Sequence, residues 1–163
     1  MLHDIGKLRI PPEIIQKPSK LTDNEYAIIK KHPEYGYEIL STKNLNSKIK
    51  LAALQHHERY DGKGYPDGLK GDEIPISAQI VSIADVYDAL VSERVYKKAF
   101  SHKKAMEMIL NGECGAFNPL LLECLVEIQD RIKTELDGSG SVKKETYKKT
   151  IQEIERDMNI NTL

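Results

Sequence analysis

The side chains most able to do chemistry in this chain are histidines and aspartates spread over several segments. They are His3, Asp4, His32, His56, His57 and Asp85. Imidazole and carboxylate groups with no thiolate among them suit divalent first-row metals such as Mn, Fe, Co, Ni or Zn. A single histidine is more often a surface or core residue than a ligand. The prediction of a metal site therefore depends on all six side chains meeting in space.

The adjacent pair His56 and His57 stands where two kinds of sequence meet. The segment SKIKLAALQHH has the apolar body of a helix, and the glycine-rich segment from Glu58 to Pro75 is typical of a loop. Neighbouring side chains on a helix point about 100° apart, because one turn takes 3.6 residues. Both imidazoles can face one cavity only where the helix ends, and the loop provides that end.

The chemistry expected of such a cluster is hydrolysis of a phosphate ester. A carboxylate beside a histidine can bridge two metal ions about 3.5–4 Å apart, and such a pair lowers the pKa of a bridging water. Basic groups near the ligands would bind phosphate oxygens, and the candidates are Lys7, Arg94 and Lys97. The alternative for Arg94 and Lys97 is a surface cation pair. Tyr65 in the glycine-rich loop could stack on a base or cap the core.

The segments that carry these residues are predicted to be helical, so the expected fold class is all-α. Thr22 and Glu25 match a capping box at the start of one helix, and Pro33 should interrupt that stretch. Asn118 and Pro119 are typical of an N-cap and a first turn. Apolar spacing predicts further helices over 47–57, 77–96 and 102–110. The apolar stripe of the 77–96 helix consists of Ile80, Ile83, Ala84, Tyr87, Leu90 and Val91.

Composition indicates one globular domain, with 24 basic and 25 acidic residues. That balance argues against bulk nucleic-acid binding, which needs a basic excess. No apolar run reaches membrane-spanning length, and Cys114 and Cys124 are expected to be buried thiols in a reducing compartment. We therefore expect a cytoplasmic location. A polar linker and a charged helix are predicted over 133–163, as a solvated tail or as an arm that packs on a partner.

Four strings in this sequence resemble the HD-GYP family in their order and spacing. They are HDIGK at 3–7, HPEYGYEIL at 32–40, HHERYDGKGYP at 56–66 and IADVYDALVSERVYKKA at 83–99. The resemblance implies an HD-domain helical bundle with an irregular GYP loop, which we assign to residues 1–132. It also implies a metal-dependent phosphodiesterase that hydrolyses cyclic di-GMP, a bacterial second messenger, or a related cyclic dinucleotide. The products would be pGpG, GMP or both.

The resemblance further implies roles for individual residues. Metal ligands would be His3, Asp4 and Asp85 at a first ion and His32, His56 and His57 at a second, with Asp4 bridging the two. The cofactor would be a binuclear Fe or Mn centre. Substrate contacts would come from Lys7, Tyr65, Arg94 and Lys97, and the residues acting in catalysis would be Asp4 and Lys7.

The position of the His3–Asp4 pair motivates an alternative. In the family this pair lies well inside a helical domain and a further metal ligand comes from upstream, so we expect the N-terminal part of the domain to be lacking here. A chain short of that ligand could bind nucleotide or a protein partner without turnover. A homo-oligomer or a missing sensor domain is an expected partner. A different nucleotide substrate is a third interpretation.

Overall fold

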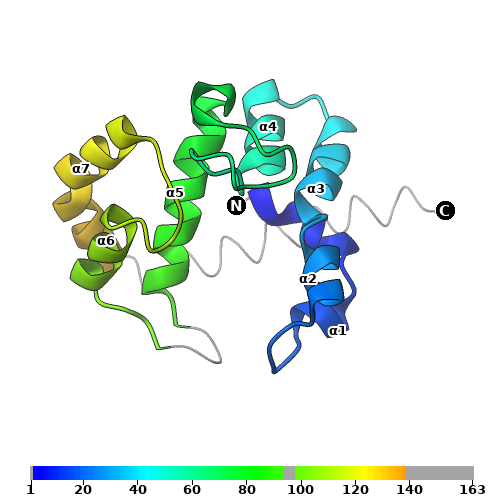
Figure 1. The fold of residues 1–163 in the computed structure, drawn as a ribbon, viewed down its shortest axis with the longest axis horizontal. Helices are drawn as coiled ribbons and strands as arrows, with labels where there is room; N and C mark the ends of the chain where they lie inside the picture. The colour runs from blue at the N-terminus through cyan, green and yellow to red at the C-terminus, as the bar shows by residue number, and fades with distance from the viewer. Residues whose placement is uncertain (1, 94–97, 139–163) are drawn as a thin grey trace. The chain divides into compact units, whose positions relative to one another are not determined.

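The computed structural model describes residues 2–93 and 98–138, and this part of the chain is helical (Figure 1). Its elements are η1 (Leu2–Arg9), α1 (Pro12–Ile15), α2 (Asp23–Ile29), α3 (His32–Ser41), α4 (Ser47–Gln55), η2 (Gly71–Glu73), α5 (Ile76–Val91), α6 (His102–Leu110) and α7 (Pro119–Gly138). The η elements are 3-10 helices. No β-strand occurs in the described residues, where an isolated bridge joins Asp61 and Lys70. The predicted all-α fold class is confirmed.

The chain divides into two compact units, Met1–Glu123 and Cys124–Leu163. In the first unit α3 packs on α4, α4 on α5 and α5 on α6, while η1 packs against α3 and α4 (Figure 1). This unit contains every residue predicted to form the site. The charged helix predicted near the C-terminus falls within 139–163, outside the described residues. Among the described helices, none is long and apolar enough to cross a membrane.

A glycine allows η1 to lie directly on α3. A Cβ at Gly6 would overlap the carbonyl oxygen of His32 and the backbone nitrogen of Gly36. The two backbones can approach this closely only because Gly6 has no side chain. Their contact brings Asp4 beside His32, so two elements that carry candidate ligands meet here.

Local sequence signals fix the ends of several helices as predicted. Thr22 and Glu25 form a capping box at α2, in which the Glu25 backbone N–H donates to Thr22 Oγ1 at 3.3 Å and the Thr22 N–H donates to Glu25 Oε2 at 2.7 Å. Pro33 lies in the first turn of α3, so the predicted interruption separates α2 from α3. At α7, Asn118 Oδ1 accepts the backbone N–H of Leu120 at 3.0 Å.

The helix predicted over 77–96 differs from α5 in extent and in its buried face. It ends at Val91, because Ser92 has extended backbone angles, φ −90° and ψ 136°. Ile80 is exposed, whereas the polar Gln79 and Ser82 are buried. Both polar side chains have hydrogen-bond partners that compensate for burial, at Ile74 O for Gln79 and at Arg59 for Ser82. Such partners come from other segments and leave no trace in an apolar pattern.

The expectation of two buried thiols is also wrong in part. Cys114 is half-buried, and Cys124 is exposed. Cys124 lies on a side of α7 where Glu123 and Glu127 are exposed as well. The buried face of this helix is carried instead by its neighbour Leu125.

Candidate metal centre

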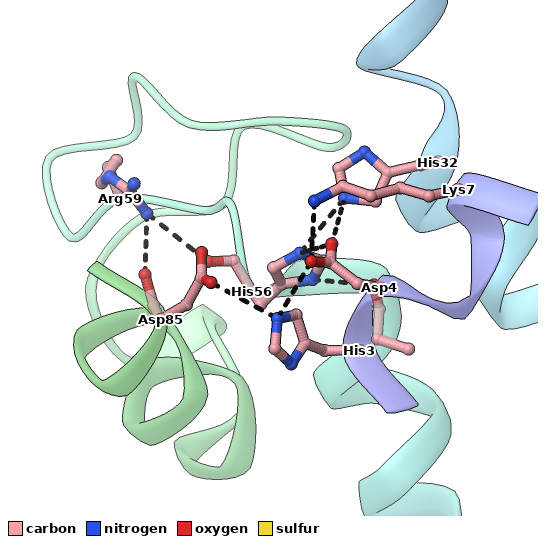
Figure 2. Close-up of polar contacts among 9 residues, drawn as sticks. His3, Asp4, Lys7, His32, His56, Arg59 and Asp85 are labelled. Carbon is pink, nitrogen blue, oxygen red and sulfur yellow. Dashed lines mark hydrogen bonds and ion pairs between the residues drawn. The ribbon is translucent and has the colours of Figure 1, made fainter. Parts of the chain in front are cut away.

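The six predicted metal-binding side chains converge from four segments of the first unit. His3 and Asp4 come from η1, His32 from the start of α3, His56 and His57 from the C-terminal end of α4, and Asp85 from α5. Figure 2 shows these elements meeting around the Asp4 carboxylate. Asp4 Oδ1 lies 3.3 Å from His32 Nε2 and 3.8 Å from His56 Nε2.

Two groups of side chains could each hold a metal ion. One consists of His32, His56 and His57, the other of His3, Asp4 and His56, and within each group the ligand atoms lie within 4.8 Å of one another. His56 belongs to both groups, although the resemblance assigns it to one ion. Asp85 Oδ1 lies 3.4 Å from His3 Nε2, so its carboxylate borders the second group.

The tautomers of His32 and His56 are set by backbone carbonyl groups. His32 Nδ1 lies 2.8 Å from Ile29 O, and His56 Nδ1 lies 2.9 Å from Ala53 O. A carbonyl oxygen only accepts, so each Nδ1 carries the proton and each Nε2 presents a lone pair. The two Nε2 atoms face each other at 3.3 Å. Two lone pairs in this position repel, and a shared or adjacent cation would remove the repulsion.

Buried polar atoms without partners support the same conclusion. Both ring nitrogens of His3 and Oδ1 of Asp4 are buried and lack a hydrogen-bond partner among the described residues. His3 Nε2 approaches Asp4 Oδ2 only to 3.5 Å. Unsatisfied buried polar atoms are costly and rare in folded proteins. The donor set, its lone pairs and its unsatisfied atoms therefore fit divalent cations.

His3 and Asp4 are both charged at neutral pH in the metal-free protein. Burial opposes the charged form of His3, but the carboxylates of Asp4 and Asp85 outweigh it and raise the pKa of His3 to about 9. Burial also opposes ionisation of Asp4, yet the charged His3 and the Lys7 ammonium hold the pKa of Asp4 well below its usual range. Asp4 is thus a carboxylate at neutral pH, which is the form a metal ligand needs, whereas His3 carries a proton that a bound cation would displace.

The adjacent histidines His56 and His57 have pKa values below the ordinary value for histidine. Burial lowers the pKa of His56 to about 4, and nearby His3 and His32 add to the effect. Burial also lowers the pKa of His57, helped by His56 and His32. Both imidazoles are neutral at pH 7 and can therefore coordinate a cation.

The loop after His57 is held by a buried carboxylate. Glu58 is only 2% exposed. Its Oε1 accepts the backbone N–H groups of Asp67 at 2.7 Å and Gly68 at 3.1 Å, and its Oε2 accepts that of Leu69 at 3.1 Å. Glu58 therefore fastens the far side of the loop to the end of α4. Tyr65 lies inside the closed segment, and its ring stacks on His57 at 4.7 Å between centroids.

Arg59 ties this loop to α5. Its Nη1 donates to Ser82 Oγ at 2.7 Å and to Glu58 O at 3.0 Å, and it approaches His56 O at 3.4 Å. Its guanidinium also lies 5.5 Å from the centre of the Phe117 ring. Arg59 was not predicted to take part in the site, because nothing near it in the chain indicates partners on α5.

The predicted substrate contacts are resolved only in part. Lys7 Nζ donates to Asp4 Oδ2 at 2.7 Å, so Lys7 lies at the centre (Figure 2). Tyr65 also borders it, through His57. Arg94 and Lys97 lie outside the described residues, and their predicted contacts with the nucleotide stay predictions.

Comparisons with known proteins identify the family of this chain. The sequence model of the HD domain matches residues 1–116. A cyclic di-GMP phosphodiesterase of Vibrio cholerae is 43% identical over 137 residues, which are 80% of this chain and 28% of that protein. The cyclic di-GMP phosphodiesterase response regulator RpfG of Xanthomonas campestris is 46% identical over 127 residues, 77% of this chain and 34% of that protein.

The chain is also similar to a relative named for a different substrate and to a protein of solved structure. The 3'3'-cGAMP-specific phosphodiesterase 2 of Vibrio cholerae is 47% identical over 131 residues, 79% of this chain and 25% of that protein. The chain thus spans about a third or less of the length of these curated relatives. Bd1817, an HDG"Y"P protein from Bdellovibrio bacteriovorus, has a similar fold, with a TM-score of 0.61 and 23% identity over 80% of this chain and 40% of that one.

Proposed function

The chain belongs to the HD domain family, and on that premise we propose that its histidine and aspartate cluster is the metal centre of a cyclic-dinucleotide phosphodiesterase. The resemblance to HD-GYP proteins seen in the sequence is confirmed by the family match and the relatives. The observation that carries the proposal is the meeting of Asp4 with the lone pairs of His32 and His56.

The proposed substrate is cyclic di-GMP, with 3'3'-cGAMP as a second candidate. Relatives named as cyclic di-GMP phosphodiesterases support the first, and a relative named as specific for 3'3'-cGAMP supports the second. The proposed products are pGpG, GMP or both. Because such a substrate is an intracellular signal, we also propose a cytoplasmic location. We retain residues 1–132 as the catalytic domain and 133–163 as its polar extension.

The ligands divide naturally over two ions, for which we propose Fe or Mn. His32, His56 and His57 would hold one ion, and His3 and Asp85 the other, with Asp4 between them. When bound, the metals supply a hydroxide near neutral pH and neutralise charge on the phosphoryl oxygens. The Nδ1 bonds of His32 and His56 to backbone carbonyls fix the rings for this role.

The chain's own residues would position the substrate. Lys7 is a half-exposed ammonium beside Asp4, and it can pair with an oxygen of the scissile phosphate. Burial raises the pKa of Tyr65, so its hydroxyl stays protonated and can donate a hydrogen bond. Glu58 and Arg59 would hold the loop so that Tyr65 stays against His57.

Turnover by the purified protein tests this function. Protein loaded anaerobically with Fe(II) or Mn(II) should convert cyclic di-GMP to pGpG or GMP, as followed by chromatography. Asp4→Ala should abolish product formation, whereas replacing an exposed acid away from the centre, as in Glu113→Ala, should not. Failure to hydrolyse any cyclic dinucleotide with metal bound would contradict the proposal.

A further inference from the structure

Lys30 is a cation beside the proposed centre that no motif indicates. It follows α2 as its C-cap and stands two residues before His32. Its Nζ lies 4.7 Å from the centre of the Tyr65 ring and 5.8 Å from the centre of the Tyr26 ring. The Tyr65 ring in turn stacks on His57 at 4.7 Å. The ammonium and a proposed metal ligand thus contact the same aromatic ring.

Two tyrosine rings lie beside this ammonium, but no carboxylate does among the described side chains. Lys7 pairs with Asp4 and Lys17 with Glu25, whereas no carboxylate lies within ion-pair distance of Lys30 among the described side chains of residues 2–93 and 98–135. Lys30 is also half-buried, which removes part of its hydration. Cation–π contacts compensate for this loss only partly. An anionic group of the substrate placed beside Lys30 would therefore interact favourably with its ammonium.

A structural role explains only part of this arrangement. A cation at a helix C-terminus stabilises the helix through its dipole, and Lys30 occupies such a position on α2. That role does not require the side chain to lie over Tyr65, which stacks on His57. His57 stacks on Tyr65 and the ammonium lies over the same ring, so these two contacts already use part of the surface on which a nucleobase would stack. The phosphate of a nucleotide suits this position better than its base.

From this geometry we propose that Lys30 binds the second, non-scissile phosphodiester of the cyclic dinucleotide. The inference rests on the proposed function, which places the first phosphodiester at the metal ligands. Both phosphodiesters belong to one macrocycle, so the second must lie close to the centre when the first is bound. Lys30 would then favour cyclic dinucleotides over esters with a single phosphate.

The experiment compares a two-phosphate with a one-phosphate substrate. Metal-loaded wild type, Lys30→Met, Lys30→Arg and Lys31→Met would be assayed with cyclic di-GMP and with bis(p-nitrophenyl) phosphate. Lys31 is the matched control, because it is the adjacent cation and is exposed. For Lys30→Met the ratio of kcat/KM for cyclic di-GMP to that for the nitrophenyl ester should fall about tenfold to a hundredfold, as expected for a lost charged hydrogen bond. Lys30→Arg should recover most of the ratio.

The outcomes separate this inference from the proposed function. A ratio that Lys30→Met leaves at the wild-type value, or lowers no more than Lys31→Met does, overturns the role of Lys30. If wild type hydrolyses the nitrophenyl ester but no cyclic dinucleotide, the proposed function fails. Equilibrium binding of cyclic di-GMP to the same four proteins then decides the role of Lys30. Equal affinity of wild type and Lys30→Met, or no binding by either, overturns it.

Discussion

Replacement of Glu58 should destabilise the domain more than its place in a surface loop suggests. Its carboxylate is buried and accepts three backbone N–H groups from residues 67–69. Each hydrogen bond to a charged group contributes about 1.5–3 kcal/mol. Asp67 and Gly68 are exposed, so water would replace part of what Glu58→Ala removes. The free energy of unfolding should therefore fall by about 3–5 kcal/mol rather than by the full sum of three bonds.

Glu58→Gln provides a graded test of the same bonds. The amide keeps one accepting oxygen but turns a donor NH2 group toward a backbone N–H. The free energy of unfolding of Glu58→Gln should therefore be about 1–3 kcal/mol lower than that of wild type. Glu73→Ala is the control, because the Glu73 carboxylate accepts one exposed N–H from the same loop, that of Lys70 at 2.9 Å. Glu73→Ala should lower the free energy of unfolding by less than about 1 kcal/mol.

Urea unfolding of the metal-free proteins, followed by circular dichroism, would give these free energies. Calorimetric titration with Mn(II) should also show weaker binding by Glu58→Gln, because the loop starts at the ligands His56 and His57. If Glu58→Ala unfolds within about 0.5 kcal/mol of wild type, a difference typical of neutral surface changes, Glu58 does not fasten the loop.

Three further perturbations test the centre and its support. Asp4→Asn should abolish turnover and lower metal content, measured by elemental analysis, because the amide cannot bridge as a carboxylate does; retained activity would contradict this. Gly6→Ala should lower the free energy of unfolding in urea by roughly 1–3 kcal/mol, since its Cβ would overlap backbone atoms of α3, and a loss no larger than that of Gly36→Ala, whose Cβ would meet its neighbours only at ordinary contact distances, would refute the close packing. The metal-free protein should be most stable near pH 6.5. The raised pKa of His3 gives stability that is lost as pH rises toward about 9, and the lowered pKa of His56 gives stability that is lost as pH falls from 6.5 toward about 4. Urea unfolding in EDTA at several pH values would show this maximum, and a monotonic dependence would exclude it.

The set of candidate ligands could be foreseen from residue types, from the position of helix ends and from the resemblance to HD-GYP proteins. His56 and His57 reach one cavity since α4 ends at Gln55, as the following loop sequence indicates. The capping box of Thr22 and Glu25 and the break at Pro33 are equally local and were predicted correctly. Such signals need only neighbouring residues.

Features that depend on contacts between distant segments could not be foreseen. Ser82 is buried because Arg59 donates to it from the loop, so the apolar stripe predicted for α5 was partly wrong. The close approach of η1 to α3 depends on Gly6 facing His32, a pairing that no spacing rule reveals. The position of Lys30 over Tyr65 likewise joins the end of α2 to the GYP loop.

Metal content per chain tests the central claim most directly. Elemental analysis of anaerobically purified protein should find two first-row metal ions per chain, one held by His32, His56 and His57 and the other by His3 and Asp85, with Asp4 between them. A parallel Asp4→Asn sample should contain less. Fewer than one ion per chain in the wild type, under conditions that retain metals, would contradict a binuclear centre.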